Sequence, residues 1–126
     1  MNTSLTCLIV DDSPEFFEAA TQLLADDAIT VVGVAANAAQ AVDEALTLRP
    51  DVALVDVNLG DESGLDVAER LAGLRNGGPP VVLTSAETGS ELAELVEASA
   101  ALGFVSKTDL SGDAIRKLLA RADSGG

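Results

Sequence analysis

The segment Thr6-Cys7-Leu8-Ile9-Val10-Asp11-Asp12-Ser13-Pro14 changes from mostly apolar to polar residues within a few positions. Its first half is short, apolar and partly β-branched, which predicts a buried strand over 6–10. Two acids end that strand. Asp12 or Ser13 can cap a following helix, and Pro14 suits the first turn, where its missing N–H would have no helical partner. The segment therefore predicts a strand, an acidic turn and a helix.

The rest of the chain repeats this strand–helix unit. The first helix is expected to bury one face, made of Phe16, Ala19, Ala20, Leu23 and Leu24. Further strands are predicted over 29–35, 51–56, 81–84 and 103–106, and further helices over 38–48, 64–74, 87–101 and about 111–122. Strict alternation favours a parallel sheet with helices on both faces. We predict a doubly wound, flavodoxin-like α/β fold of five strands and five helices, with strand order 2-1-3-4-5, as one domain over residues 1–126.

Reactive side chains stand at the carboxyl ends of four predicted strands. Asp11 and Asp12 follow the first strand, Asp56 the third, Thr84 the fourth and Lys107 the fifth. In an open parallel sheet, ligands bind at this edge, beside the point where the strand order reverses. That point lies between the first and third strands, so the three acids are expected to share one crevice.

Three ionised carboxylates in one crevice need a cation. Two unit charges ~4 Å apart repel by roughly 4 kcal/mol at an effective dielectric of ~20. Oxygen ligands with room for water suit Mg²⁺. The Thr84 hydroxyl and the Lys107 ammonium, on the other side, would suit a tetrahedral oxyanion. Attack by an aspartate on a phosphoryl group uses all these parts, and the central Asp56 is the best nucleophile.

Each of these residues also has an ordinary interpretation. Asp11, Asp12 and Asp56 can each be a turn former or a helix cap, and Thr84 can simply end a strand. Lys107 is harder to dismiss, since the chain holds only two lysines. The combination at four strand ends is what points to phosphoryl chemistry.

Composition excludes several other functions. The 126 residues include no histidine and one cysteine, so histidine catalysis, a phosphohistidine carrier and an internal disulfide are excluded. A net charge of −14 and 2% aromatic residues argue against direct binding of nucleic acid. No apolar stretch is long enough for a signal or a membrane span, so we expect a cytoplasmic protein with Cys7 as a small buried hydrophobe.

Over essentially its whole length the chain resembles the receiver domain of two-component response regulators. The matching motifs are Ile-Val-Asp-Asp-Ser-Pro at 9–14, Leu-Val-Asp-Val-Asn-Leu at 54–59, Val-Leu-Thr-Ser-Ala at 82–86 and Gly-Phe-Val-Ser-Lys at 103–107. The resemblance implies phosphorylation of Asp56, with Mg²⁺ held by Asp12, Asp56 and the carbonyl of Asn58 and supported by Asp11. It also implies that Thr84 and Lys107 bind the phosphoryl oxygens.

The family further implies a switch. Thr84 would move toward the phosphoryl group, and the aromatic side chain of Phe104 would turn inward, which changes the surface of 87–101, 103–106 and 111–122. Two departures concern loop geometry: Thr108 follows the lysine where proline is usual, and Gly60 stands where proline is common. No cis bond is therefore expected after Lys107.

The resemblance implies partners rather than an enzyme with its own substrate. The phosphoryl donor would be a sensor histidine kinase or a phosphotransfer protein, and the target an output protein or an appended DNA-binding domain. The local sequence around Asp56 most resembles receivers of helix-turn-helix regulators. A homodimer is one arrangement of such domains. Phe17 is a candidate for docking the kinase if Phe16 alone faces the core; the alternative is that both rings are buried.

Three other functions stay open at this level. One is a pseudo-receiver that binds partners without phosphorylation. Another is an aspartate-nucleophile phosphatase, which Asn58 argues against because those enzymes place a second aspartate there. The last is that the chain is a receiver excised from a longer transcription factor.

Overall fold

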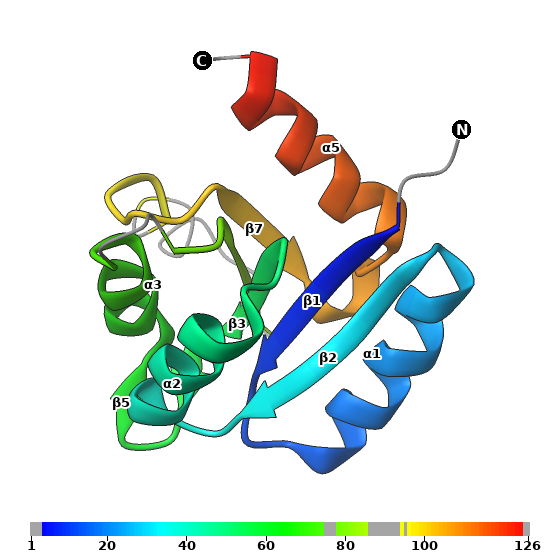
Figure 1. Ribbon diagram of the computed structural model, residues 1–126. Coiled ribbons are helices and arrows are strands. Elements are labelled where there is room, and N and C mark those ends of the chain that lie inside the picture. The colour runs from blue at the N-terminus through cyan, green and yellow to red at the C-terminus, as the bar shows by residue number, and fades with distance from the viewer. Residues whose placement is uncertain (1–3, 75–77, 86–93, 95, 125–126) are drawn as a thin grey trace.

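A computed structural model of the protein shows five parallel strands in one sheet (Figure 1). The structure describes residues 4–74, 78–85, 94 and 96–124. In sheet order the strands are β2 (Ile29–Ala35), β1 (Leu5–Val10), β3 (Val52–Asp56), β6 (Val81–Ser85) and β7 (Gly103–Ser106). Since β4 and β5 form a separate small hairpin, β6 and β7 are the fourth and fifth strands of the predicted set. The predicted order 2-1-3-4-5 is confirmed.

Helices follow the strands as the alternation predicts. Those described in full are α1 (Pro14–Asp26), α2 (Ala38–Leu48), α3 (Gly64–Ala72) and α5 (Gly112–Ser124). The predicted helix over 87–101 lies largely outside the described residues; within it, Glu94, Val96 and Glu97 are helical. Among the described helices, none combines the length and apolar character needed to span a bilayer.

The sheet separates two apolar clusters. Leu8 and Val10 of β1 belong to one cluster, together with residues of α2 and α3, whereas Cys7 and Ile9 belong to the other, together with residues of α1 and α5. Figure 1 shows where these helices lie around the sheet. This alternation is the two-residue period of a strand buried on both faces. Cys7 is fully buried, as predicted, and burial raises the pKa of its thiol to about 12.

The buried face of α1 differs from the predicted one. Ala20 and Leu24 are buried, but Leu23 is 41% exposed and Ala19 is also exposed. Successive helical residues are rotated by about 100°, so a row through 20 and 24 turns 19 and 23 toward the rim. Including these two residues in the core face was wrong.

The loop after β3 contains structure that the sequence pattern did not predict. Strands β4 (Asn58–Leu59) and β5 (Glu62–Ser63) form an antiparallel hairpin, which Gly60 turns with a φ of +73°. Glycine adopts that left-handed conformation without the steric penalty that proline or any other residue would meet. The hairpin thus explains why glycine stands at this position.

Candidate functional site

Three carboxylates meet at the carboxyl edge of the sheet, as the strand ends predicted. Asp11 and Asp12 follow β1, and Asp56 ends β3, its immediate neighbour in the sheet. One carboxylate oxygen from each lies within 4.8 Å of the other two. Asp11 is 3% exposed and Asp56 is 8% exposed, whereas Asp12 is open to solvent. Two of the three negative charges are therefore held away from water and need compensation.

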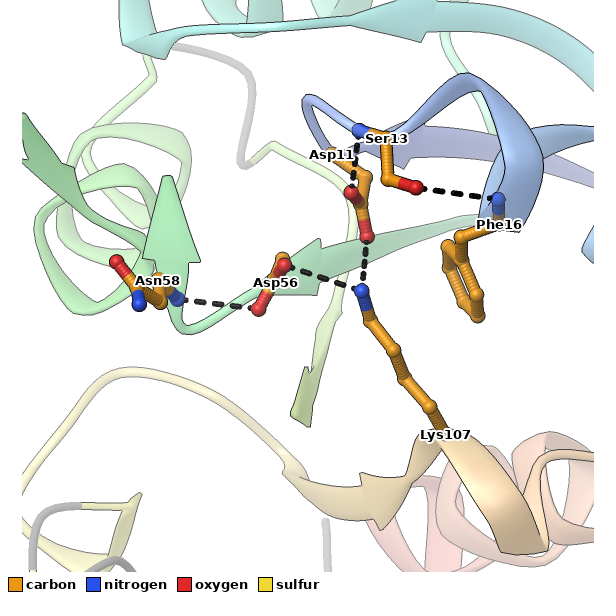
Figure 2. Close-up of polar contacts among 6 residues, drawn as sticks. All are labelled: Asp11, Ser13, Phe16, Asp56, Asn58 and Lys107. Atoms are coloured by element: carbon orange, nitrogen blue, oxygen red, sulfur yellow. Dashed lines mark hydrogen bonds and ion pairs between the residues drawn. The ribbon is translucent and has the colours of Figure 1, made fainter. Parts of the chain in front are cut away.

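Lys107 supplies a positive charge to both buried acids. The lysine begins the short 3-10 helix η1 (Lys107–Asp109) directly after β7, and its side chain reaches back across the sheet edge (Figure 2). Its Nζ lies 2.8 Å from Asp11 Oδ2 and 3.2 Å from Asp56 Oδ2. Asp11 Oδ2 has no hydrogen bond from the described residues apart from this ion pair.

Burial and pairing act in opposite directions on the two members of the Asp56–Lys107 pair. Burial raises the pKa of Asp56, and it outweighs the hydrogen bonds from the Asn58 N–H and from Lys107 that favour the charged form. For Lys107, burial alone would lower the pKa, but the hydrogen bonds to Asp11 and Asp56 outweigh it and raise the pKa. Lys107 therefore keeps its positive charge, whereas its contacts do not fully offset the cost of burying the negative charge of Asp56.

Backbone groups orient the two buried carboxylates. The Ser13 N–H donates to Asp11 Oδ1 at 2.8 Å, and the Asn58 N–H donates to Asp56 Oδ1 at 3.1 Å (Figure 2). Each acid therefore has one oxygen fixed by the loop that follows it, and the other facing Lys107. Asn58, a predicted metal ligand through its carbonyl, is held beside Asp56 by this contact and by its pairing with Ser63 in the hairpin.

The hairpin that carries Asn58 is tied to the neighbouring helix. Glu62 accepts a hydrogen bond from the Ala38 N–H at 2.8 Å, where it satisfies a free donor at the N-terminus of α2. Gly60 brings the hairpin turn close to Asp12: a Cβ added there would lie 3.7 Å from Asp12 Oδ2. These contacts fix the hairpin after β3 beside Asp11 and Asp12. Sequence spacing alone did not assign this role to Glu62.

Thr84 lies beside Asp56 in the sheet. The two residues are register partners in the β3–β6 pairing, and the Val57 N–H donates to the Thr84 carbonyl at 2.8 Å. The Thr84 hydroxyl is fully buried and has no hydrogen-bond partner among the described residues. An unpaired buried hydroxyl is costly, so this group is available to a ligand or to a rearrangement.

The three phenylalanines lie against two different apolar clusters. Phe104 lies on β7 and is half-buried against the apolar cluster beneath α2 and α3. Phe16 and Phe17 are both half-buried against the opposite cluster, so neither is fully in the core nor fully in solvent. Phe16 has a further contact that the sequence did not reveal: its ring centroid lies 4.3 Å from Lys107 Nζ.

The geometry suits a small anionic substrate and a hard cation. A buried carboxylate, a neighbouring acid pair and a lysine place oxygen ligands and a positive charge at one edge of the sheet. The oxygen donors of Asp11, Asp12 and Asp56 fit Mg²⁺, which prefers carboxylates and water. A separate cleft of about 390 Å³ lies at the opposite edge, lined in part by Arg49, Pro50 and Pro80, and contains none of these residues.

Comparison with known proteins identifies the family. Residues 7–120 match the response regulator receiver domain, and the chain belongs to this family of two-component signalling proteins. The resemblance of the strand-end motifs is thereby confirmed. The fold is also that of the signal receiver domain of NarL from Mycobacterium tuberculosis, with a TM-score of 0.79, 27% identity and 98% of each chain covered.

The curated relatives are longer proteins with different names. One, of Pseudomonas aeruginosa, carries the name "Putative transcriptional regulator" and is 36% identical over 102 residues, which are 81% of this chain and 49% of the relative. A protein-glutamate methylesterase/protein-glutamine glutaminase of Archaeoglobus fulgidus is 36% identical over 104 residues, 81% of this chain and 29% of the relative. The chain thus spans half or less of these relatives.

Proposed function

We propose that the protein is a phosphorylation-dependent switch whose acceptor is Asp56. The observation that carries this proposal is the setting of that carboxylate: buried, register partner of Thr84, and 3.2 Å from the Lys107 ammonium. A carboxylate used only as a helix cap would have no reason to face a lysine and two further acids.

The chemical step is nucleophilic attack by an Asp56 oxygen on the phosphorus of a phosphohistidine in a partner protein. A carboxyl–phosphoryl O–P bond forms, the P–N bond breaks, and the imidazole leaves and takes up a proton. Lys107 stabilises the negative charge on the transferring group, and the Thr84 hydroxyl donates to one of its oxygens. These 126 residues contain no histidine, so the phosphoryl group comes from outside them.

The acid cluster is the proposed binding site for the metal ion. Asp11, Asp12 and Asp56, with the carbonyl of Asn58, would hold Mg²⁺, which when bound neutralises charge on the phosphoryl oxygens. Asp12 is the exposed member and would take the ion directly from solvent. Asp11 would stay fixed by Ser13 and support the ligand set.

The output of the switch would run through Thr84 and Phe104. A hydroxyl with no partner gains one when it turns toward the phosphoryl group, and the space it leaves would accept the half-buried Phe104 ring. The surface of residues 87–101, β7 and α5, part of which lies outside the described residues, would then differ between the two states and be sensed by a partner.

We propose that residues 1–126 form a single receiver domain that acts in the cytoplasm. Its donor would be a sensor histidine kinase or a phosphotransfer protein, with Phe17 on α1 as a docking candidate. Its target would be an output protein, a second copy, or a DNA-binding domain outside these residues, because the −14 charge opposes DNA contact here. It would turn over no substrate beyond forming and hydrolysing its own aspartyl phosphate.

Mass spectrometry after incubation with acetyl phosphate and Mg²⁺ tests this function. The expected result is one phosphoryl adduct on the wild type, none on Asp56→Asn, and one on the matched control Asp43→Asn. Asp43 lies exposed on α2 and is not a member of the acid cluster. The proposal is wrong if the wild type gains no adduct, or if Asp56→Asn retains it.

A further inference from the structure

Lys107 and three other residues form a closed ring of contacts. Ser13 donates its backbone N–H to Asp11 Oδ1, and its hydroxyl accepts from the Phe16 N–H at 3.3 Å. The Phe16 ring then lies 4.3 Å from Lys107 Nζ, and Lys107 pairs with Asp11 Oδ2 (Figure 2). The first turn of α1 and the lysine are thereby joined through both a carboxylate and an aromatic ring.

The position of Phe16 follows from the helix cap. Ser13 is the N-cap of α1, and Phe16 is the residue whose N–H its side chain accepts. That bond fixes the first turn, so the ring leaves the helix at a defined point next to the acid pair. Phe17, the next residue on α1, packs on the same apolar cluster, but Lys107 has its ring contact with Phe16.

Charge alone does not fix the ammonium in one place. Lys107 is flanked by Asp11 and Asp56, and its four-carbon chain can favour either carboxylate or turn toward solvent. A ring face attracts a cation through its quadrupole and at the same time excludes water from that side. With the ring present, the ammonium has two acids on one side and an aromatic face on another.

We propose that Phe16 is a positioning residue that holds the Lys107 ammonium over Asp56 for phosphoryl transfer. This inference rests on the proposed function and deepens it, because it identifies a residue of α1 that holds the charge-stabilising lysine in position. The contact is worth about a two- to fivefold change in the population of a held ammonium. Loss of the ring should slow phosphorylation of Asp56 by the same factor.

Nuclear magnetic resonance of the lysines tests the contact itself. The chain has only two lysines, so selective ¹³C-lysine labelling gives two sets of side-chain signals. Lys107 Hε should be shifted upfield by the ring, while the exposed Lys117, paired with Asp113, provides an internal reference. In Phe16→Leu the upfield shift should vanish; in Phe16→Tyr and in the matched control Phe17→Leu it should persist.

The rate of phosphorylation tests the role. With saturating Mg²⁺ and phosphoramidate as donor, Phe16→Leu should react about two- to fivefold more slowly than the wild type, and Phe16→Tyr should restore the rate. Leucine keeps apolar bulk but has no ring face, whereas tyrosine restores the ring. Thermal denaturation of each variant separates a change in rate from partial unfolding.

The outcomes distinguish this inference from the proposed function. If Phe16→Leu is phosphorylated as fast as the wild type, or if Phe16→Tyr fails to rescue a slow variant that is folded, the inference is overturned and Asp56 phosphorylation stands. If no variant and no wild-type protein takes up a phosphoryl group, the proposed function fails. An unshifted Lys107 signal in the wild type would remove the contact on which the inference depends.

Discussion

Asp56 is buried, and its hydrogen bonds do not fully offset the cost of holding its negative charge away from water. Desolvation raises its pKa from the ordinary value of 3.8, even though Lys107 and the Asn58 N–H both favour the charged form. The folded protein therefore binds the Asp56 proton more tightly than the unfolded chain does. A carboxylate held in this way reduces stability whenever it is ionised, and perturbed pKa values of this kind cluster at functional sites.

The sign of this effect gives a pH prediction for the metal-free protein. Because the folded pKa is raised, stability attributable to Asp56 is present at low pH and is lost as pH rises from about 4 through the folded pKa. Asp56→Asn should therefore unfold at a higher temperature than the wild type at pH 7 in EDTA, and the difference should shrink toward pH 4. Calorimetry at several pH values measures this. An asparagine variant less stable than the wild type at pH 7 would contradict it.

At the scale of elements, the two helices on one face of the sheet are joined end to end. Asp27 caps the C-terminus of α1, and its Oδ2 accepts the Gly112 N–H at the start of α5 at 2.8 Å. Arg116 of α5 donates back to the Asp27 carbonyl at 3.0 Å. Each helix end thus satisfies a free backbone group of the other, which fixes where α5 begins.

Removing the Asp27 side chain should loosen this joint. Asp27→Ala leaves the Gly112 N–H without its acceptor and should lower the free energy of unfolding by about 1 kcal/mol, as loss of a helix cap does. Urea denaturation measures the change, with Asp26→Ala as the matched control, because it removes the same charge from the adjacent, exposed residue. Equal effects of the two substitutions would mean that charge, not the hydrogen bond, is responsible.

The elements differ in how far the sequence predicted them. Strands and helices of four or more residues follow from apolar periodicity, and their order follows from the open doubly wound sheet that their alternation indicates. The hairpin of Asn58–Leu59 with Glu62–Ser63 and the 3-10 turn at Lys107–Asp109 have too few residues to show any period. Their form depends on local hydrogen bonds, such as those of Ser106 with Thr108.

At the scale of the whole molecule, the site was predictable where topology decides position. Parallel strands bring their carboxyl ends to one edge, so Asp11 and Asp56 had to be neighbours once the order was known. The contact of Phe16 with Lys107 was not predictable, since it joins the first turn of one helix to the end of the last strand. Side-chain reach across the sheet edge depends on tertiary packing that a pattern of residues does not encode.

The net charge of −14 makes the response to magnesium a test at this same scale. Any salt should stabilise the folded chain by screening repulsion among its acids, and Mg²⁺ should add a specific part by binding the folded state alone. At about a hundredfold excess over its Kd, that part is about 2.7 kcal/mol. Thermal denaturation in MgCl₂ should therefore give a higher Tm than NaCl of equal ionic strength.

Asp12 separates the two contributions, because it is exposed and belongs to the acid cluster. Asp12→Asn should lose most of the difference between MgCl₂ and NaCl while keeping the rise in Tm with NaCl. Asp66→Asn, which removes one exposed charge on α3, should keep both. If Asp12→Asn and Asp66→Asn responded identically to Mg²⁺, the ion would be acting on the overall charge of the chain, and the acid cluster would hold no specific site.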